Sequence, residues 1–454
     1  MKKETIFFAL TEFVGLFLAF FAPVSYSFNF CLTLNIIYLI LNVYYFTRHR
    51  DQIIGFPGLF AFTFYFVNFI YPVVYYPTPL RYISLFSFDF DENIISYATA
   101  VALLAYNSYL LGMSYFKAES HVKGHVRLIT QSDYKFVLLF FVIAFLIFLF
   151  AGGFSYFGLQ YSEGINATSG NSLLQYFAPF QLTLLEMVLI LLFTQKNIFE
   201  KWKTLVIVIT FIVIGFYLYN GNRSNPLTLG LIILFMYNDK IKRIKIKYFL
   251  LIGIIGVVLF TAIGLYRGTG YTDVSLREMT SEMDSGLDFF TDLVLNNRAL
   301  YTLISDAKNN GLNPGTEISN FSPLPFMGSI LCAIFNVPHN QSGTAVYNSY
   351  LSFGNEITLG MGTNAVSDMY IGFGLLGTLV GFYLFGYIFS IYRMKSTVYS
   401  NYFYSFIYYC ISAGAVFTCR GSIMSWIKDF LWMSIILVFV RLITREGKKL
   451  PESK

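Results

Sequence analysis

Long apolar segments, repeated along almost the whole chain, are the feature that most restricts its fold. A helix needs about 20 predominantly apolar residues to cross a bilayer, and twelve segments reach or approach that length. They cover residues 5–24, 28–47, 53–77, 94–116, 135–157, 173–194, 202–219, 225–238, 247–266, 369–392, 402–419 and 428–444. Only 12% of the residues are charged, against about 25% in soluble domains. The sequence therefore predicts an all-α polytopic membrane protein with about twelve transmembrane helices.

The connections between these segments alternate in charge. One set of connections, which includes both ends of the chain, holds 23 of the 31 basic residues, and the positive-inside rule makes that set cytoplasmic. We therefore expect a multi-pass protein of a bacterial cytoplasmic membrane with both termini inside. Helices 1–9 fall in residues 1–266, one large extracytoplasmic loop in 267–367, and helices 10–12 with a cytoplasmic tail in 368–454. The basic residues form no patch, so we expect no nucleic-acid partner.

Arginine is enriched among the basic residues that are predicted to face outward. Six of these eight residues are arginines, against seven of the 23 cytoplasmic ones. Arginine binds phosphate through two parallel hydrogen bonds, which lysine does not offer. Arg223 lies in the short turn "YNGNRSNPL" (219–227), and Arg420 also lies directly beside an apolar segment. These arginines are candidates for phosphate binding; alternatively, they lie at headgroup level or pair with outer carboxylates.

The outer loop is expected to contain amphipathic helices. Apolar residues recur at spacings of three and four over 272–295, which is typical of a helix. A second helical stretch, 298–308, begins with Arg298. The Gly-, Asn-, Pro- and Ser-rich sequence after it faces a ligand or is merely a linker.

His339 is the only histidine that is predicted to face outward. An imidazole titrates near neutral pH and can accept a proton from an attacking hydroxyl. It is therefore our first candidate for a general base, with Asp368 and Glu356 as further candidates. A polar loop histidine without a catalytic role is the alternative.

The stretch "GTNAVSDMYIGFGLLG" (362–377) leads into the tenth apolar segment. We expect Asp368 to cap the start of this helix. The glycines at 372, 374 and 377 lie within an apolar span. They therefore predict a smooth face for close helix packing and do not indicate a phosphate-binding loop.

These features together resemble a known family. The number of helices, the large outer loop late in the chain, the "NGNRSNPL" turn and the 362–377 segment are similar to those of the O-antigen or capsule repeat-unit polymerases, the Wzy group. The architectural similarity spans almost the whole chain. The residue-level match is confined to 220–230, loosely to the stretch around His339, and to 362–377. The resemblance implies a fold like that of the GT-C polymerases and ligases.

The resemblance also implies a glycosyltransferase that uses no metal, no other cofactor and no nucleotide sugar. The growing glycan leaves its undecaprenyl-diphosphate carrier at the outer leaflet and joins the non-reducing end of a lipid-linked repeat. Outward arginines suit the negative charge that develops on the leaving diphosphate. The expected catalytic residues are His339, Arg223, Arg420 and Asp368. The expected substrate-binding residues are Arg267, Arg298, Asn364, Tyr370 and Glu356. Membrane lipids and a chain-length regulator protein are the other expected partners.

Two other functions stay open at this stage. A histidine in the outer loop is more typical of the related O-antigen ligases, which use the same donor with lipid A core as acceptor. A flippase or another transporter is the alternative from a different class. Glu12 and Glu186 lie within apolar segments, as proton-coupled carriers often require, but the two halves of the chain show no internal repeat.

Overall fold

The computed structural model describes residues 3–77, 90–115, 131–153, 172–194, 200–219, 222–268, 291–322, 327–357, 360–399 and 402–446. Every regular element in these ranges is a helix, as the sequence predicts. Each of the twelve apolar segments contains helical residues, and five of the described helices are long and apolar enough to cross a membrane. The protein is thus an all-helical polytopic membrane protein, whereas the number of twelve spans remains a prediction.

The chain divides into two compact units, each built from segments that lie far apart in the sequence. Unit 1 comprises Met1–Val122, Phe290–Met394 and Gly414–Lys428. Its α-helices are α1 (Lys3–Phe20), α2 (Phe28–Arg48), α3 (Phe56–Asn68), α4 (Ile95–Tyr115), α13 (Thr291–Val294), α14 (Asn296–Asn310), α15 (Met327–Phe335), α16 (Thr344–Phe353), most of α17 (Ala365–Tyr399), and α19 (Ala415–Arg420). Short helical turns join them: η1 (Arg50–Gln52), η2 (Tyr71–Tyr75), η4 (Glu92–Ile94), η8 (Pro314–Ser319) and η9 (His339–Gln341).

Unit 2 comprises Lys123–Phe289, Lys395–Ala413 and Asp429–Lys454. Its helices are α5 (Gln131–Phe148), η5 (Leu149–Gly153), α8 (Ser172–Thr194), α9 (Glu200–Tyr219), α10 (Ser224–Met236), η6 (Tyr237–Ile241), α11 (Ile246–Gly268), α18 (Tyr402–Ala413) and most of α20 (Trp426–Glu446). The predicted amphipathic helix at 272–295 lies mostly outside the described residues. The second predicted helix of the outer loop is confirmed as α14. The division into 1–266, 267–367 and 368–454 stays a prediction.

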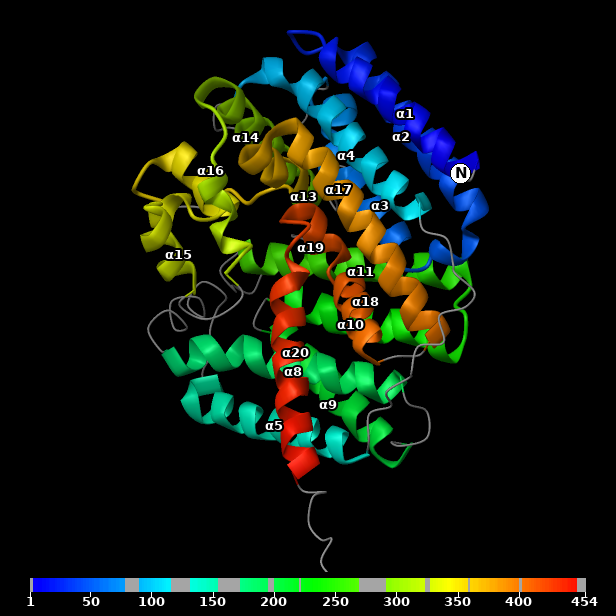
Figure 1. The fold of residues 1–454 in the computed structure, drawn as a ribbon, viewed down its shortest axis with the longest axis vertical. Coiled ribbons are helices and arrows are strands. Elements are labelled where there is room, and N and C mark those ends of the chain that lie inside the picture. Colours follow the sequence, from blue (N-terminus) through cyan, green and yellow to red (C-terminus); the bar gives the residue numbers. More distant parts are fainter. Residues whose placement is uncertain are drawn as a thin grey trace, which may run out of the picture. The chain divides into compact units, whose positions relative to one another are not determined.

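Helices α4 and α17 lie side by side in unit 1, where two glycines permit a very close crossing (Figure 1). A Cβ atom on Gly112 would lie 2.1 Å from the carbonyl oxygen of Tyr383, and one on Gly386 would lie 2.2 Å from that of Tyr109. Small residues at such a crossing let two backbones approach without a side chain between them. The glycines on both helices therefore determine this contact.

Many large apolar side chains on the outside of the helices are exposed. Phe13 and Phe17 of α1 and Leu250 and Ile254 of α11 have exposed fractions between 58% and 72%. Large contiguous apolar surfaces are rare on soluble proteins. These helix faces are therefore suited to contact with the lipid of a membrane.

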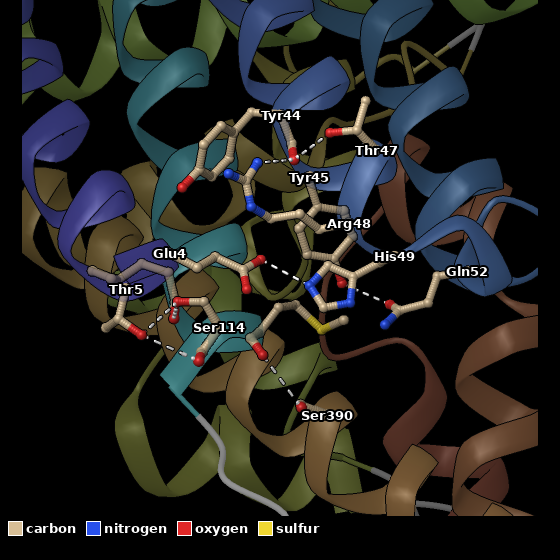
Figure 2. A network of polar contacts seen from close by, with 12 residues as sticks. Glu4, Thr5, Tyr44, Tyr45, Thr47, Arg48, His49, Gln52, Ser114 and Ser390 are labelled. Carbon is tan, nitrogen blue, oxygen red and sulfur yellow. Dashed lines mark hydrogen bonds and ion pairs between the residues drawn. The ribbon is translucent and has the colours of Figure 1, made fainter. Parts of the chain in front are cut away.

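One end of α1 is joined to the end of α2 and to α4 by a polar network (Figure 2). Oε1 of Glu4 lies 2.8 Å from Nε2 of His49, directly after α2. The neighbouring Thr5 hydroxyl donates to the carbonyl oxygen of Ser114 at 3.2 Å, near the end of α4. The three helix ends therefore meet through side chains that carry charges and hydroxyl groups.

Candidate functional site

Asn364, and not Asp368, caps the start of α17. The Asn364 side-chain oxygen accepts the backbone N–H of Val366 at 2.9 Å, whereas Asp368 lies inside the first turn. The Asn364 amide also donates to the side-chain oxygen of Asn68 at 2.9 Å, at the end of α3. The prediction that Asp368 caps the helix was therefore wrong, because an Asn directly before the first helical residue is better placed to do so.

Asp368 is instead the centre of a buried cluster of polar side chains. Its side chain is 1% exposed. The Thr344 hydroxyl, at the start of α16, donates to Oδ1, and the Asn320 amide donates to Oδ2 at 3.2 Å. Ser422, in the segment after α19, is a third hydrogen-bond partner of this carboxyl group. All three partners can donate to the oxygens of Asp368, which suits an ionised carboxylate.

Glu317 places a second carboxyl group in the same cluster. It lies in η8, is 2% exposed, and accepts the Asn320 amide on Oε2 at 2.7 Å. Burial, and then the nearby charge of Asp368, raise the pKa of Glu317 to about 8. Glu317 therefore holds a proton at neutral pH, because two like charges this close are not both stable in a buried site.

Two glycines of α17 make room for η8. A Cβ on Gly372 would lie 2.7 Å from Oε1 of Glu317, so only a glycine leaves space for that carboxyl group. Gly374 has φ of 69° and interrupts the helix. Within the interrupted turn the carbonyl oxygen of Ile371 accepts the N–H of Asn313 at 2.8 Å. The expected smooth packing face is therefore broken by a kink, since helical hydrogen bonds cannot continue through that conformation.

His339 lies on the surface, and in the sequence it is close to Thr344 of this cluster. It begins η9, its side chain is exposed, and it precedes Thr344 by five positions. The N–H of Ser319 donates to the carbonyl oxygen of Ser342 at 2.8 Å, which fastens the turn to η8. The imidazole therefore sits on the solvent side of a segment whose next helix contacts Asp368.

The segment that carries Arg420 meets the cluster through Ser422. Arg420 is the last residue of α19 and is partly exposed, and it precedes Ser422 by two positions. Helix α19 packs against α3, where the Cys419 thiol donates to the carbonyl oxygen of Phe60 at 3.6 Å. The structure therefore brings the segments that carry Asp368, His339 and Arg420 together in unit 1.

Three other predicted residues of unit 1 differ in how accessible their side chains are. Arg298 in α14 is 2% exposed, and its Nη2 donates to the Ser352 hydroxyl at 3.4 Å. The Tyr370 hydroxyl lies 2.9 Å from the Tyr97 hydroxyl and is not open to solvent, since Tyr370 is 7% exposed. Glu356 is exposed after the end of α16. Of these three residues, only Glu356 has a freely accessible side chain in this structure.

Arg223 and Arg267 belong to unit 2. Arg223 directly precedes α10 and is partly exposed. The turn around it is fixed by Asn222, whose side-chain oxygen accepts the N–H groups of Ser224 at 3.0 Å and Asn225 at 3.2 Å. Helix α10 thus begins at Ser224, one residue before the predicted segment of 225–238. Arg267 lies in the last turn of α11, and its side chain is outside the described part of the chain.

Four residues of the cluster were not singled out from the sequence: Glu317, Asn320, Thr344 and Ser422. Glu317 is the charged residue of a stretch that reads as a ligand-facing loop or a linker. The spacing of Glu317 and Asn320 places both on one side of a helical turn. That spacing is a weak signal, because it does not show which distant carboxyl group the turn contacts.

Comparison with known proteins gives the family of the chain. No curated protein and no solved structure matches it. The family model of the O-antigen polysaccharide polymerase Wzy matches residues 5–446, which is nearly the whole chain. The chain therefore belongs to the O-antigen polysaccharide polymerase (Wzy) family.

Proposed function

We propose that the protein transfers a growing glycan from undecaprenyl diphosphate to the non-reducing end of a lipid-linked repeat unit, at the outer face of the bacterial inner membrane. The observation that carries this proposal is the Asp368 cluster. It joins three segments of the predicted outward side, one with Asp368 itself, one with His339 and one with Arg420. Membership of the family supports the polymerisation of O-antigen repeat units in general.

The chemistry that these residues offer matches a transfer from a diphosphate carrier. The bond between the anomeric carbon of the growing glycan and the diphosphate oxygen breaks, and a bond from that carbon to the acceptor oxygen forms. The acceptor proton passes to the exposed imidazole of His339. The partly exposed guanidinium of Arg420 stabilises the charge on the leaving diphosphate. A guanidinium in this role supplies positive charge at the leaving group without a metal ion, so we propose a metal-independent reaction.

Asp368 has a positioning role in this scheme. Its carboxylate is buried, and it holds Thr344 and Ser422, which follow His339 and Arg420 in the chain by five and two positions. A buried acceptor that satisfies donors from separate segments fixes those segments relative to one another. The orientation of the base, His339, and of the phosphate-binding Arg420 therefore depends on Asp368, which does not touch the substrate.

The remaining assignments come from the sequence and the resemblance. Arg223 and Arg267 are proposed as further ligands of the diphosphate, and Arg298, Asn364, Tyr370 and Glu356 as residues that bind the glycan or hold its binding surface. Both termini are proposed to be cytoplasmic, with twelve spans and the loop of 267–367 outside. A chain-length regulator protein is the proposed protein partner.

The test is the glycan produced by a strain that lacks this gene. We expect the deletion to leave glycan of a single repeat, and the wild-type gene to restore the ladder of longer chains. The Arg420→Ala variant should give no ladder at a normal membrane level. Arg48→Ala is the matched control, because Arg48 is exposed in a connection that we predict to be cytoplasmic; it should restore the ladder.

Other outcomes of this experiment would support other functions. A deletion strain with no repeat attached to lipid A indicates a ligase. A deletion strain whose lipid-linked repeats stay on the cytoplasmic side of the membrane indicates a flippase. An unchanged ladder in the deletion strain contradicts all three functions.

A further inference from the structure

Glu317 and Asp368 form a pair of buried carboxyl groups around one amide nitrogen. Nδ2 of Asn320 donates to Oε2 of Glu317 at 2.7 Å and to Oδ2 of Asp368 at 3.2 Å. The two side chains are 2% and 1% exposed. The protein therefore holds two acidic groups within reach of the same donor in a site that excludes bulk water.

The two carboxyl groups have unequal partners. Asp368 has Thr344, Asn320 and Ser422. Glu317 has Asn320 on one oxygen, whereas its buried Oε1 has no hydrogen-bond partner among the described residues. An ionised carboxylate with an unsatisfied buried oxygen is strongly disfavoured. The proton of the pair therefore belongs on Glu317, while the donors around Asp368 stabilise its negative charge.

In the described elements that pack against η8, counting only the start of α17, there is no lysine or arginine to balance a second carboxylate. The elements that pack against η8 are α15, α16, η9 and the start of α17. Their titratable groups are Cys332, His339, Tyr347, Tyr350, Asp368 and Tyr370. His339 is exposed, and the Tyr347 hydroxyl donates to Asp306 at 2.8 Å. Arg420 lies on the segment that holds Ser422, two positions before it.

We propose that Glu317 is a positioning residue whose proton keeps η8, α16 and the Ser422 segment together, so that alkaline pH separates them and stops polymerisation. The inference rests on the proposed function, because polymerisation is its biological readout. Loss of the proton leaves two negative charges at one amide nitrogen, and like charges at this distance repel in a buried site. The repulsion acts on the contacts that orient His339 and Arg420.

The sign of the pH effect follows from the direction of the shift. Burial and the charge of Asp368 raise the pKa of Glu317 to about 8, from an ordinary value of 4.5. The folded protein therefore binds this proton more tightly than the unfolded chain does. Its stabilising contribution is complete below the ordinary value and is lost as the pH rises through about 8.

The test uses the full-length protein, purified in detergent, and the lipid-linked single repeats extracted from the deletion strain. Chain formation on a gel is followed as the pH is raised. We expect the wild-type rate to fall above about pH 8, by about tenfold for each further pH unit. Glu317→Gln should work within about twofold of wild type at neutral pH and keep its rate at alkaline pH, since an amide cannot ionise and still donates a hydrogen bond. Glu92→Gln, which changes an exposed acid of η4 with no role in the proposed site, should follow the wild-type profile.

A second measurement separates this inference from the proposed function. The thermal unfolding midpoint of the same proteins is followed over the same pH range. It should fall with rising pH in the wild type and in Glu92→Gln, and fall less in Glu317→Gln. If the wild type forms no chains, the proposed function fails. The unfolding midpoint alone then tests whether the Glu317 proton stabilises its contact with Asp368. Equal pH dependence of wild type and Glu317→Gln, in rate or in unfolding midpoint, would overturn the inference, as would a folded Glu317→Gln variant that is inactive at every pH.

Discussion

Gly372 and Glu317 occupy one space: a Cβ atom on Gly372 would lie 2.7 Å from Oε1 of Glu317 and 2.8 Å from its Cγ. The Gly372→Ala substitution should therefore displace the carboxyl group or η8. We expect a loss of about 1–3 kcal/mol in the free energy of unfolding, which is typical of overpacking, and a weaker ladder in the cell. Gly230→Ala is the matched control, because a Cβ there meets nothing within 4 Å. An unfolding midpoint for Gly372→Ala that equals that of the control would show that the space is not occupied as described.

The charge on Arg420 should matter more for turnover than for substrate binding. If the guanidinium stabilises the leaving diphosphate, Arg420→Ala should lower kcat by about 10²–10³-fold, as the removal of one such donor does in other enzymes. The kcat of Arg420→Lys should lie between those of the wild type and Arg420→Ala, because an ammonium keeps the charge but not the two parallel hydrogen bonds. The measurement is steady-state kinetics on extracted lipid-linked repeats. A rise in KM at unchanged kcat would assign Arg420 to ground-state binding instead.

The crossing of α4 and α17 should be intolerant of any side chain at its glycines. A Cβ on Gly112 would lie 2.1 Å from a backbone oxygen of α17, which only a shift of the whole helix can relieve. We expect Gly112→Ala to remove most of the protein from the membrane fraction. Gly253→Ala on α11 meets nothing within 4 Å. It should be neutral or stabilise the helix by up to about 1 kcal/mol. Normal levels of Gly112→Ala in the membrane would refute the close crossing.

Much of the fold was predictable because it depends on local sequence. Apolar segments of membrane length indicate helices whatever surrounds them, and residues 298–308 carry enough helical periodicity to predict α14. The kink in α17 was not predicted. A glycine in an apolar segment suits both close packing and an interruption, and the choice depends on how η8 packs against the helix.

The candidate site was predicted only in part, for a related reason. Asp368, His339 and Arg420 were found because each is a chemically distinctive residue on the predicted outward side. Glu317 and Ser422 were missed because their importance comes from contact with Asp368, which lies 51 and 54 positions away from them in the chain. A single sequence shows helical and charge patterns, but it does not show which distant segments meet.

The proposed orientation predicts which positions are reachable from outside the cell. The four native cysteines are buried, so they should react little with a membrane-impermeant maleimide. Glu356→Cys changes an exposed residue of the outer loop, and Arg50→Cys an exposed residue of η1. On intact spheroplasts the Glu356→Cys variant should be labelled, and the Arg50→Cys variant should be labelled only after permeabilisation. The reverse pattern would mean that the assignment of inside and outside is inverted.

On the proposed function, this chain alone joins lipid-linked repeats with release of the carrier diphosphate. The most direct measurement mixes the purified full-length protein with lipid-linked single repeats from the deletion strain, in the presence of a metal chelator. We expect a ladder of lipid-linked chains and one free undecaprenyl diphosphate for each linkage formed. Single repeats that remain unchanged, with active-site residues intact and the protein folded, would contradict the proposed function.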